Sequence, residues 1–441
     1  MRAATEPLLD ASGGPLPRDL TRHEVNFIFG VLGLCSSILW NQLLLSVGLL
    51  VSLFGESAIS YAATAQNLLC AAVMWLLTFA PQSVAMKARG GDQHRDRSIM
   101  LAAAAVICMI ALGAAICLFL MVRQLPLWLF IVIVAFDGAA TGTAQIVGAS
   151  LGGMLSGSSS DAAGALLLGE AAAPLLTALC SALSSLNPAH DAYRSTLASL
   201  ALPMAILALA LVALRMLYRA RPPGGVPLEC KTLGITSSSA EGASIISSRF
   251  RALLPNAACV GALCLLWIFF LCSIPAVAAG LCRAGPDHAD GQANGQANGQ
   301  AAQGVGECLQ GVPSLMVGAS NVAAFIGRLI GGILPPGCIP TWGLVLESVI
   351  IVVGGFAAIL ATEAFEEGVA QPVAFGGAMS AGLTLWCNAL LMRLSAAAQS
   401  SAGPEHSIMS PCPITAQISW VAIQTGCVCG SALSFVLRAG P

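Results

Sequence analysis

Long apolar runs separated by short polar breaks constrain the fold of this chain of 441 residues more than any other feature. A bilayer core about 30 Å thick requires roughly 20 apolar residues per helix, and eleven stretches reach that length. Only 9% of the residues are charged, against about a quarter in soluble domains, so the chain cannot cover a water-facing surface of its own size. The sequence therefore predicts an all-α integral membrane protein with eleven transmembrane helices, over residues 25–54, 61–85, 99–122, 127–156, 163–186, 196–218, 255–281, 313–334, 342–362, 372–396 and 414–438.

Arginine and lysine fall mostly on one side of the predicted membrane. If the N-terminus is inside, cytoplasmic segments hold most of the 19 basic residues, as the positive-inside rule expects, and Arg328 lies within a span. An odd number of spans then places the C-terminus outside the cell. We expect a cytoplasmic tail over residues 1–24, a six-helix bundle over 25–218, a cytoplasmic linker over 219–254 and a five-helix bundle over 255–441 with an external loop at 282–312.

Composition also argues against several classes of function. The net charge is -2, and the two lysines, Lys87 and Lys231, form no phosphate-binding loop, so we expect neither nucleic-acid binding nor ATP-driven pumping. Most of the 16 cysteines lie within apolar runs and the five histidines lie outside them, so we expect no metal and no cofactor. The side chains of an intramembrane protease are not evident, which argues against an enzyme or a receptor-like scaffold.

Apart from arginines in the last four positions of a span, four ionisable residues lie within predicted spans: Asp137, Glu170, Arg328 and Glu347. Such groups cost several kcal/mol unless they are paired or hydrated, so each is a candidate for a functional site. Glu347 lies near the start of its span, where its carboxylate can reach the interface. For Asp137 and Glu170, a structural pairing and a role in a polar cavity both stay open.

Neutral polar side chains are also spread through the spans. A single amide within the membrane usually joins two helices, but eight of them together with one arginine indicate a polar cavity. Trp40 lies beside Asn41, well inside the first span, and a flat ring next to an amide suits stacking on a planar heterocycle. The amides are Asn41, Gln66, Asn67, Gln145, Asn321, Asn388, Gln417 and Gln424.

These residues belong to a pattern that resembles the equilibrative nucleoside transporter family. Leu39-Trp40-Asn41 is similar to the Pro-Trp-Asn motif of the family's first helix, with leucine in place of proline. The segment from Asn321 to Arg328 follows the family's Asn-x-x-Asp-x-x-Gly-Arg, with Ala324 in place of the acid. Gln145 matches the family's fourth-helix glutamine.

The resemblance implies a 6+5 bundle similar to the major facilitator fold, in the plasma membrane. Its central cavity would open to each side in turn and would move nucleosides or nucleobases, either down their gradient or with protons. By position, the resemblance places Trp40 and Leu44 on the base side of the cavity, with Asn41 shaping it. Gln145 would bind the base edge, while Asn321 and Arg328 would bind the ribose hydroxyls.

The alanine at position 324 leaves Arg328 without the acid one helical turn before it. An unpaired buried arginine is costly, so we hypothesise that Asp137 or Glu170 supplies the opposite charge. The alternative function is a major-facilitator carrier for another small polar solute, such as a sugar or a drug. That class usually has twelve spans with both termini inside.

Overall fold

The computed structural model describes the chain over the regions that form its helices, and every regular element among them is a helix. The eleven-span count and the division into six and five helices stay predictions, because residues 372–396 and most of 342–362 lie outside this part. The described residues are 20–55, 57–79, 91–122, 126–155, 162–185, 197–220, 255, 257–269, 272, 316–330, several single positions between 342 and 357, and 413–438.

The first predicted span contains a break. Helix α1 (Arg22–Leu45) starts with a capping box, in which Thr21 N–H donates to Glu24 Oε2 over 2.8 Å and Glu24 N–H donates to Thr21 Oγ1 over 3.3 Å. It ends at Ser46, whose N–H donates back to carbonyls of the last turn, and α2 (Val47–Phe54) follows. The expectation of one continuous helix over 25–54 is therefore wrong, because Ser46 caps α1 within an unbroken apolar run.

The other described spans follow the apolar runs closely. The run at 127–156 forms a helix over Leu127–Leu155, and the run at 414–438 forms one over Pro413–Arg438. Two shorter apolar helices, Ala257–Phe269 and Met316–Ile330, lie within the predicted seventh and eighth spans. The remaining helices are α3 (Ala58–Phe79), α5 (Gly91–Val122), α6 (Leu127–Leu155), α7 (Ala162–Ser185), α9 (Ala201–Arg219) and α15 (Pro413–Arg438).

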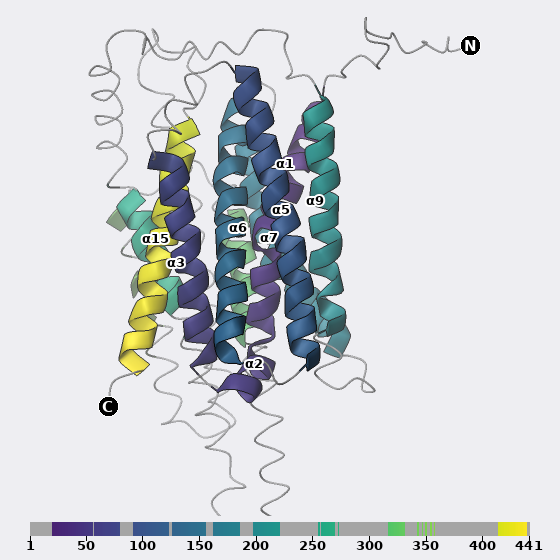
Figure 1. The fold of residues 1–441 in the computed structure, drawn as a ribbon. Coiled ribbons are helices and arrows are strands. Elements are labelled where there is room, and N and C mark those ends of the chain that lie inside the picture. Colours follow the sequence, from purple (N-terminus) through teal and green to yellow (C-terminus); the bar gives the residue numbers. More distant parts are fainter. Residues whose placement is uncertain are drawn as a thin grey trace, which may run out of the picture.

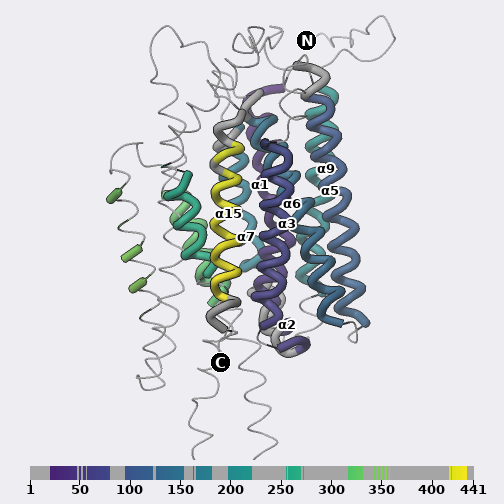
Figure 2. The backbone as a smooth tube through the Cα atoms, turned by 60° about the vertical axis from the view of Figure 1, so that its left-hand side comes forward, coloured from purple at the N-terminus to yellow at the C-terminus, as the bar shows by residue number. Residues whose placement is uncertain are grey.

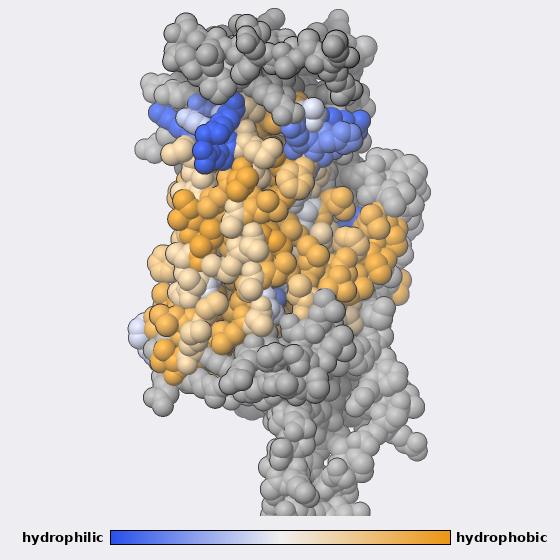
Figure 3. All heavy atoms as spheres, turned by 90° about the vertical axis from the view of Figure 1, so that its right-hand side faces the viewer, coloured by the Kyte–Doolittle hydropathy of each residue, from blue (hydrophilic) through white to orange (hydrophobic). Residues whose placement is uncertain are grey.

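The helices run roughly side by side in one bundle (Figures 1 and 2), where α6 packs against α3 and α5, and α15 packs against α3. Five of the described helices are long and apolar enough to cross a membrane. Figure 3 shows a broad hydrophobic belt with hydrophilic side chains gathered at one end of it. Exposed residues such as Leu118 on α5, Trp128 on α6 and Val212 on α9 contribute to an apolar exterior that suits lipid.

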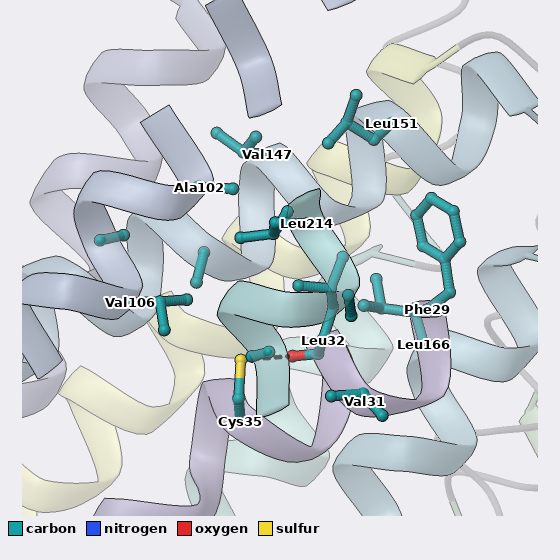
Figure 4. Close-up of a cluster of buried hydrophobic side chains, with 14 of the residues drawn as sticks. Phe29, Val31, Leu32, Cys35, Ala102, Val106, Val147, Leu151, Leu166 and Leu214 are labelled. Carbon is teal, nitrogen blue, oxygen red and sulfur yellow. Dashed lines mark hydrogen bonds between the residues drawn. The ribbon is translucent and has the colours of Figure 1, made fainter. Parts of the chain in front are cut away.

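The interior of the bundle holds a cluster of buried apolar side chains from α1, α5, α6, α7 and α9 (Figure 4). Phe29 is fully buried, and Leu166 of α7 and Leu214 of α9 belong to the same cluster. Cys35 Sγ donates to the carbonyl oxygen of Leu32 over 3.1 Å, so this thiol behaves as a small core residue.

Glycines let particular helix backbones touch. A Cβ atom added at Gly33 of α1 would lie 1.9 Å from the carbonyl oxygen of Leu166 on α7. The same holds between α6 and α3, where a Cβ at Gly138 would lie 2.1 Å from Gln66 O. A Cβ at Gly426 of α15 would lie 2.0 Å from Gly261 O. Close backbone approach of this kind is the usual way in which membrane helices associate.

Arg95, near the start of α5, caps the end of α9. Its Nη2 atom donates to the carbonyl oxygens of Leu217 and Ala220. These carbonyls have no helical donor of their own at a C-terminus, and a cation there also interacts favourably with the helix dipole. Arg95 therefore joins two helices at the polar rim of the bundle.

Replacing Arg95 by alanine is expected to destabilise the folded protein by about 2 kcal/mol, because hydrogen bonds from a charged donor are lost and two carbonyls lose their partner. The measurement is the Tm of the purified protein in detergent. Arg97→Ala is the matched control, because Arg97 is exposed on the same helix. Equal effects of the two substitutions would contradict the capping role.

Candidate functional site

A chain of polar side chains crosses the middle of the bundle at Gln145 of α6. The Nε2 atom of Gln145 donates to Glu170 Oε1 of α7 over 3.2 Å. Its Oε1 atom accepts a hydrogen bond from Gln424 Nε2 of α15 over 3.4 Å and a weak one from Cys70 Sγ of α3 over 3.9 Å. Gln145 and Gln424 are buried, so this one amide connects four helices inside the bundle.

Arg328, on the helix Met316–Ile330, is half-buried and interacts electrostatically with Glu170. Glu170 is also the acceptor for Gln145, so the guanidinium lies near the polar chain and not on a separate face. On the α1 side, Ser37 Oγ donates to the main-chain carbonyl of Glu170 over 3.5 Å. Glu170 is the acid that interacts electrostatically with Arg328 among the described residues, and the pairing of Arg328 with Asp137 or Glu170 stays a prediction.

Asp137 lies apart from this chain. Its side chain is 0% exposed, and neither carboxyl oxygen has a hydrogen-bond partner. It lies on α6 eight residues before Gln145, which is about 12 Å along the helix axis. The group is therefore enclosed between helices.

The first helix places Trp40, Asn41 and Leu44 near the C-terminal bundle. Leu44 is buried in a hydrophobic cluster with Cys264 and Met316, and the half-buried Trp40 packs against the same cluster. Asn41 is buried, but its Nδ2 donates to Ser37 O over 2.9 Å within its own helix. Trp40 and Leu44 thus contribute to a hydrophobic cluster that includes residues from both halves of the chain, while Asn41 bonds within its own helix.

Asn321 is 1% exposed, and neither its Nδ2 nor its Oδ1 has a partner. The neighbouring Ser320 Oγ is likewise buried and unpaired. Buried amides are almost always hydrogen-bonded, so unpaired ones mark places where a ligand or water is expected. Asn321 lies one turn beyond Val317, a member of the cluster around Leu44.

Sequence reasoning missed two residues as members of this site. Trp267 packs against the cluster around Leu44, and its Nε1 donor is buried without a partner. A tryptophan within an apolar run carries no signal that separates it from a core residue. Gln424 stood out only as one of several amides, because its contact with Gln145 depends on the rotation of α15.

A second hydrogen bond joins the N-terminal and C-terminal parts of the chain close to Gln424. Trp75 Nε1 of α3 donates to Thr425 Oγ1 of α15 over 3.2 Å. Neither residue stands out in the sequence as a site residue. Together with the Gln424 to Gln145 bond, it ties α15 to both α3 and α6.

Some predicted features lie outside the described residues. They are Glu347, Asn388, most of the tail over 1–24, nearly all of the linker over 219–254 and the external loop over 282–312. Within the described helices, no group of three or more histidine, cysteine, aspartate or glutamate side chains is arranged to hold a metal ion.

The overall fold resembles those of solved membrane transporters, although no family model and no curated protein matches the sequence. The crystal structure of the nucleoside transporter NupG (D323A mutant) is 12% identical with a TM-score of 0.52, covering 94% of this chain and 90% of that chain. A D-xylose-proton symporter is 10% identical with a TM-score of 0.53, covering 94% and 89%. The xylose transporter XylE from E. coli, partially occluded and inward-open, is 11% identical with a TM-score of 0.51, covering 95% and 98%.

This likeness concerns the fold. The chain shares the helical membrane fold of these transporters, which confirms the all-α, major-facilitator-like class expected from the sequence and leaves the count of eleven helices a prediction. At identities near 12%, the substrates of these proteins do not transfer to this one. The comparisons therefore confirm the bundle and leave its cargo to be argued from the side chains.

Proposed function

We propose that this chain is a membrane transporter that moves nucleosides, or nucleobases, by alternating access between its two bundles. The observation on which the proposal rests is the polar chain from Gln424 through Gln145 to Glu170, with Arg328 beside it. Polar groups this deep in a membrane bundle are costly, and a polar solute that needs hydrogen bonds explains their presence. The chain connects the two bundles, which is where a transporter of this fold binds its substrate.

The described residues offer the two chemistries that a nucleoside needs. Trp40, Leu44 and Trp267 belong to one hydrophobic cluster, which offers aromatic and aliphatic surface to a base. The unpaired amide of Asn321 and the guanidinium of Arg328 offer donors to ribose hydroxyls. Gln145 would exchange its present hydrogen-bond partners for the edge of a base. These roles agree with the resemblance to equilibrative nucleoside transporters. Membership of that family is therefore part of the proposal.

A sugar carrier is the second candidate, because structures of xylose transporters share the fold. A sugar needs the hydroxyl donors but gains little from an extended aromatic wall. Two indole rings packed against one cluster at the junction of the bundles favour a heterocycle.

The test is counterflow of labelled nucleosides in liposomes that hold the purified protein. We expect saturable, ATP-independent exchange that unlabelled nucleosides inhibit and xylose does not. Exchange of xylose alone would favour the second candidate. Exchange of neither class, and of no nucleobase, would contradict the proposal.

Replacing Trp40 by alanine is expected to raise the KM for nucleosides about tenfold, because base stacking on an aromatic ring contributes about 1–3 kcal/mol. The maximal exchange rate should change less. Trp128→Ala is the matched control, because Trp128 is 64% exposed on the outside of α6. If both variants keep the normal KM, Trp40 is not part of the binding site.

A further inference from the structure

Asp137 is enclosed in a place where a charged carboxylate is not stable. The residue lies ten positions after Leu127, the first residue of α6, which is about 15 Å into the span. Its side chain is 0% exposed and both oxygens are unpaired. An unpaired anion at that depth costs several kcal/mol, so the protonated, uncharged acid is the form that fits this conformation.

The ionisable groups around Asp137 do not offset a negative charge. The thiols of Cys70 on α3 and Cys108 on α5 interact electrostatically with it. On α7, Glu170 acts on Cys70 from the other side and carries the same sign of charge as ionised Asp137. From α1 and α15, Cys35 and Cys427 do not act on Asp137, and neither does any described arginine.

A proton suits this site better than a metal cation. Hard cations such as Na⁺ need several oxygen ligands held around them. Among the described residues, no hydroxyl or amide group is hydrogen-bonded to either oxygen of Asp137. A proton needs one oxygen only: the O–H bond forms on a carboxylate oxygen, and the same proton later leaves to water.

We propose that Asp137 is a proton-binding site that couples proton movement to solute movement. The proposal rests on the transport function argued above and assigns the coupling ion and its carrier residue. Protonated Asp137 stabilises the enclosed arrangement described here. The ionised form favours an arrangement of the bundle in which water reaches the carboxylate.

The contact between α3 and α6 gives the carboxyl group a means of acting on the site. Gly138, next to Asp137, lies against the backbone of Gln66, and Gly142 lies against that of Cys70. This close packing leaves no room for a hydrated charge, so ionisation of Asp137 must loosen it. Cys70, which takes part in this helix contact, also donates a weak hydrogen bond to Gln145. A change in the packing of α3 against α6 would therefore also move a partner of Gln145 in the polar chain.

The first experiment uses the unmodified protein in liposomes with a pH gradient. With the outside more acidic, wild-type protein should accumulate labelled nucleoside about tenfold per pH unit if one proton moves with each solute. Added nucleoside should also make the external medium more alkaline. Accumulation that follows a Na⁺ gradient in place of the pH gradient would overturn the proposal, and so would exchange without any gradient-driven accumulation.

Asp137→Asn provides the second experiment, because asparagine resembles the protonated acid but binds no proton. We expect nucleoside exchange at equal pH to persist, while accumulation under the pH gradient is lost. Asp96→Asn removes the same charge from an exposed position on α5 and should keep the accumulation. Normal accumulation by Asp137→Asn would overturn the proposal.

Infrared spectroscopy provides a third test, which does not depend on transport or on the correct folding of Asp137→Asn. The wild-type protein should show the C=O band of a protonated carboxylic acid near neutral pH, and Asp137→Glu should shift that band. A spectrum without such a band would overturn the proposal. Failure of all nucleoside exchange with the band present would instead count against the proposed transport function.

Discussion

Replacing Gly33 by alanine should prevent the protein from folding, or destabilise it by about 3 kcal/mol or more, at the upper end of the cost of overpacking. The added Cβ atom would lie 1.9 Å from the carbonyl oxygen of Leu166 and 2.9 Å from the main-chain nitrogen of Glu170. Both are backbone atoms, which cannot rotate away as a side chain can. The measurement is the yield of monodisperse protein in detergent and its Tm.

Gly30→Ala is the matched control for Gly33→Ala. Both glycines lie on α1 and face α7, but a Cβ at Gly30 would lie 3.8 Å from Ala165 O, which is ordinary contact. The change in helix propensity is the same at both positions. If Gly30→Ala is as harmful as Gly33→Ala, the effect comes from α1 itself and not from its contact with α7.

The second large effect is expected from the charges at Glu170 and Arg328. Glu170→Gln keeps an oxygen that can accept from Gln145 but removes the charge opposite Arg328. We expect each single substitution, Glu170→Gln or Arg328→Gln, to reduce uptake at least about tenfold. Breaking a fully buried pair costs about 3–5 kcal/mol, and the loss should be smaller here because Glu170 and Arg328 are each only half-buried.

The double variant shows whether the two residues act together. If they do, Glu170→Gln with Arg328→Gln should have a folded yield closer to wild type than the two single effects combined predict, with a coupling of about 1–3 kcal/mol. Arg215→Gln is the control, because Arg215 is exposed on α9. Strictly additive losses would mean that Arg328 has another partner.

Most of the described fold could be predicted from the sequence because membrane thickness fixes helix length. The run at 127–156 became a helix over Leu127–Leu155 for this reason. The end of α1 at Ser46 could not be predicted, because leucine and valine continue the apolar run on both sides. A break in a helix depends on hydrogen bonds that hydropathy does not report.

The candidate site could be predicted in its residue types but not in its pairings. Gln145, Glu170 and Arg328 stand out because polar groups are rare in apolar spans. Whether Arg328 lies near Glu170 or near Asp137 depends on how three helices are rotated about their axes. The pattern of polar and apolar residues in the sequence does not determine these rotations. The isolation of Asp137 depends on the same rotations and appears only in three dimensions.

The glycine contacts divide the molecule mechanically. Backbone touches backbone between α1 and α7, between α3 and α6, and between α15 and the helix Ala257–Phe269, which are all pairs within one half of the chain. Between the halves, α15 contacts α3 and α6 through neutral side-chain hydrogen bonds, each contributing about 1 kcal/mol net, as well as through apolar side chains. Contacts between side chains can change by rotation about single bonds, whereas touching backbones cannot, so a shift of α15 against α3 and α6 costs less than separating the helices that glycine holds together.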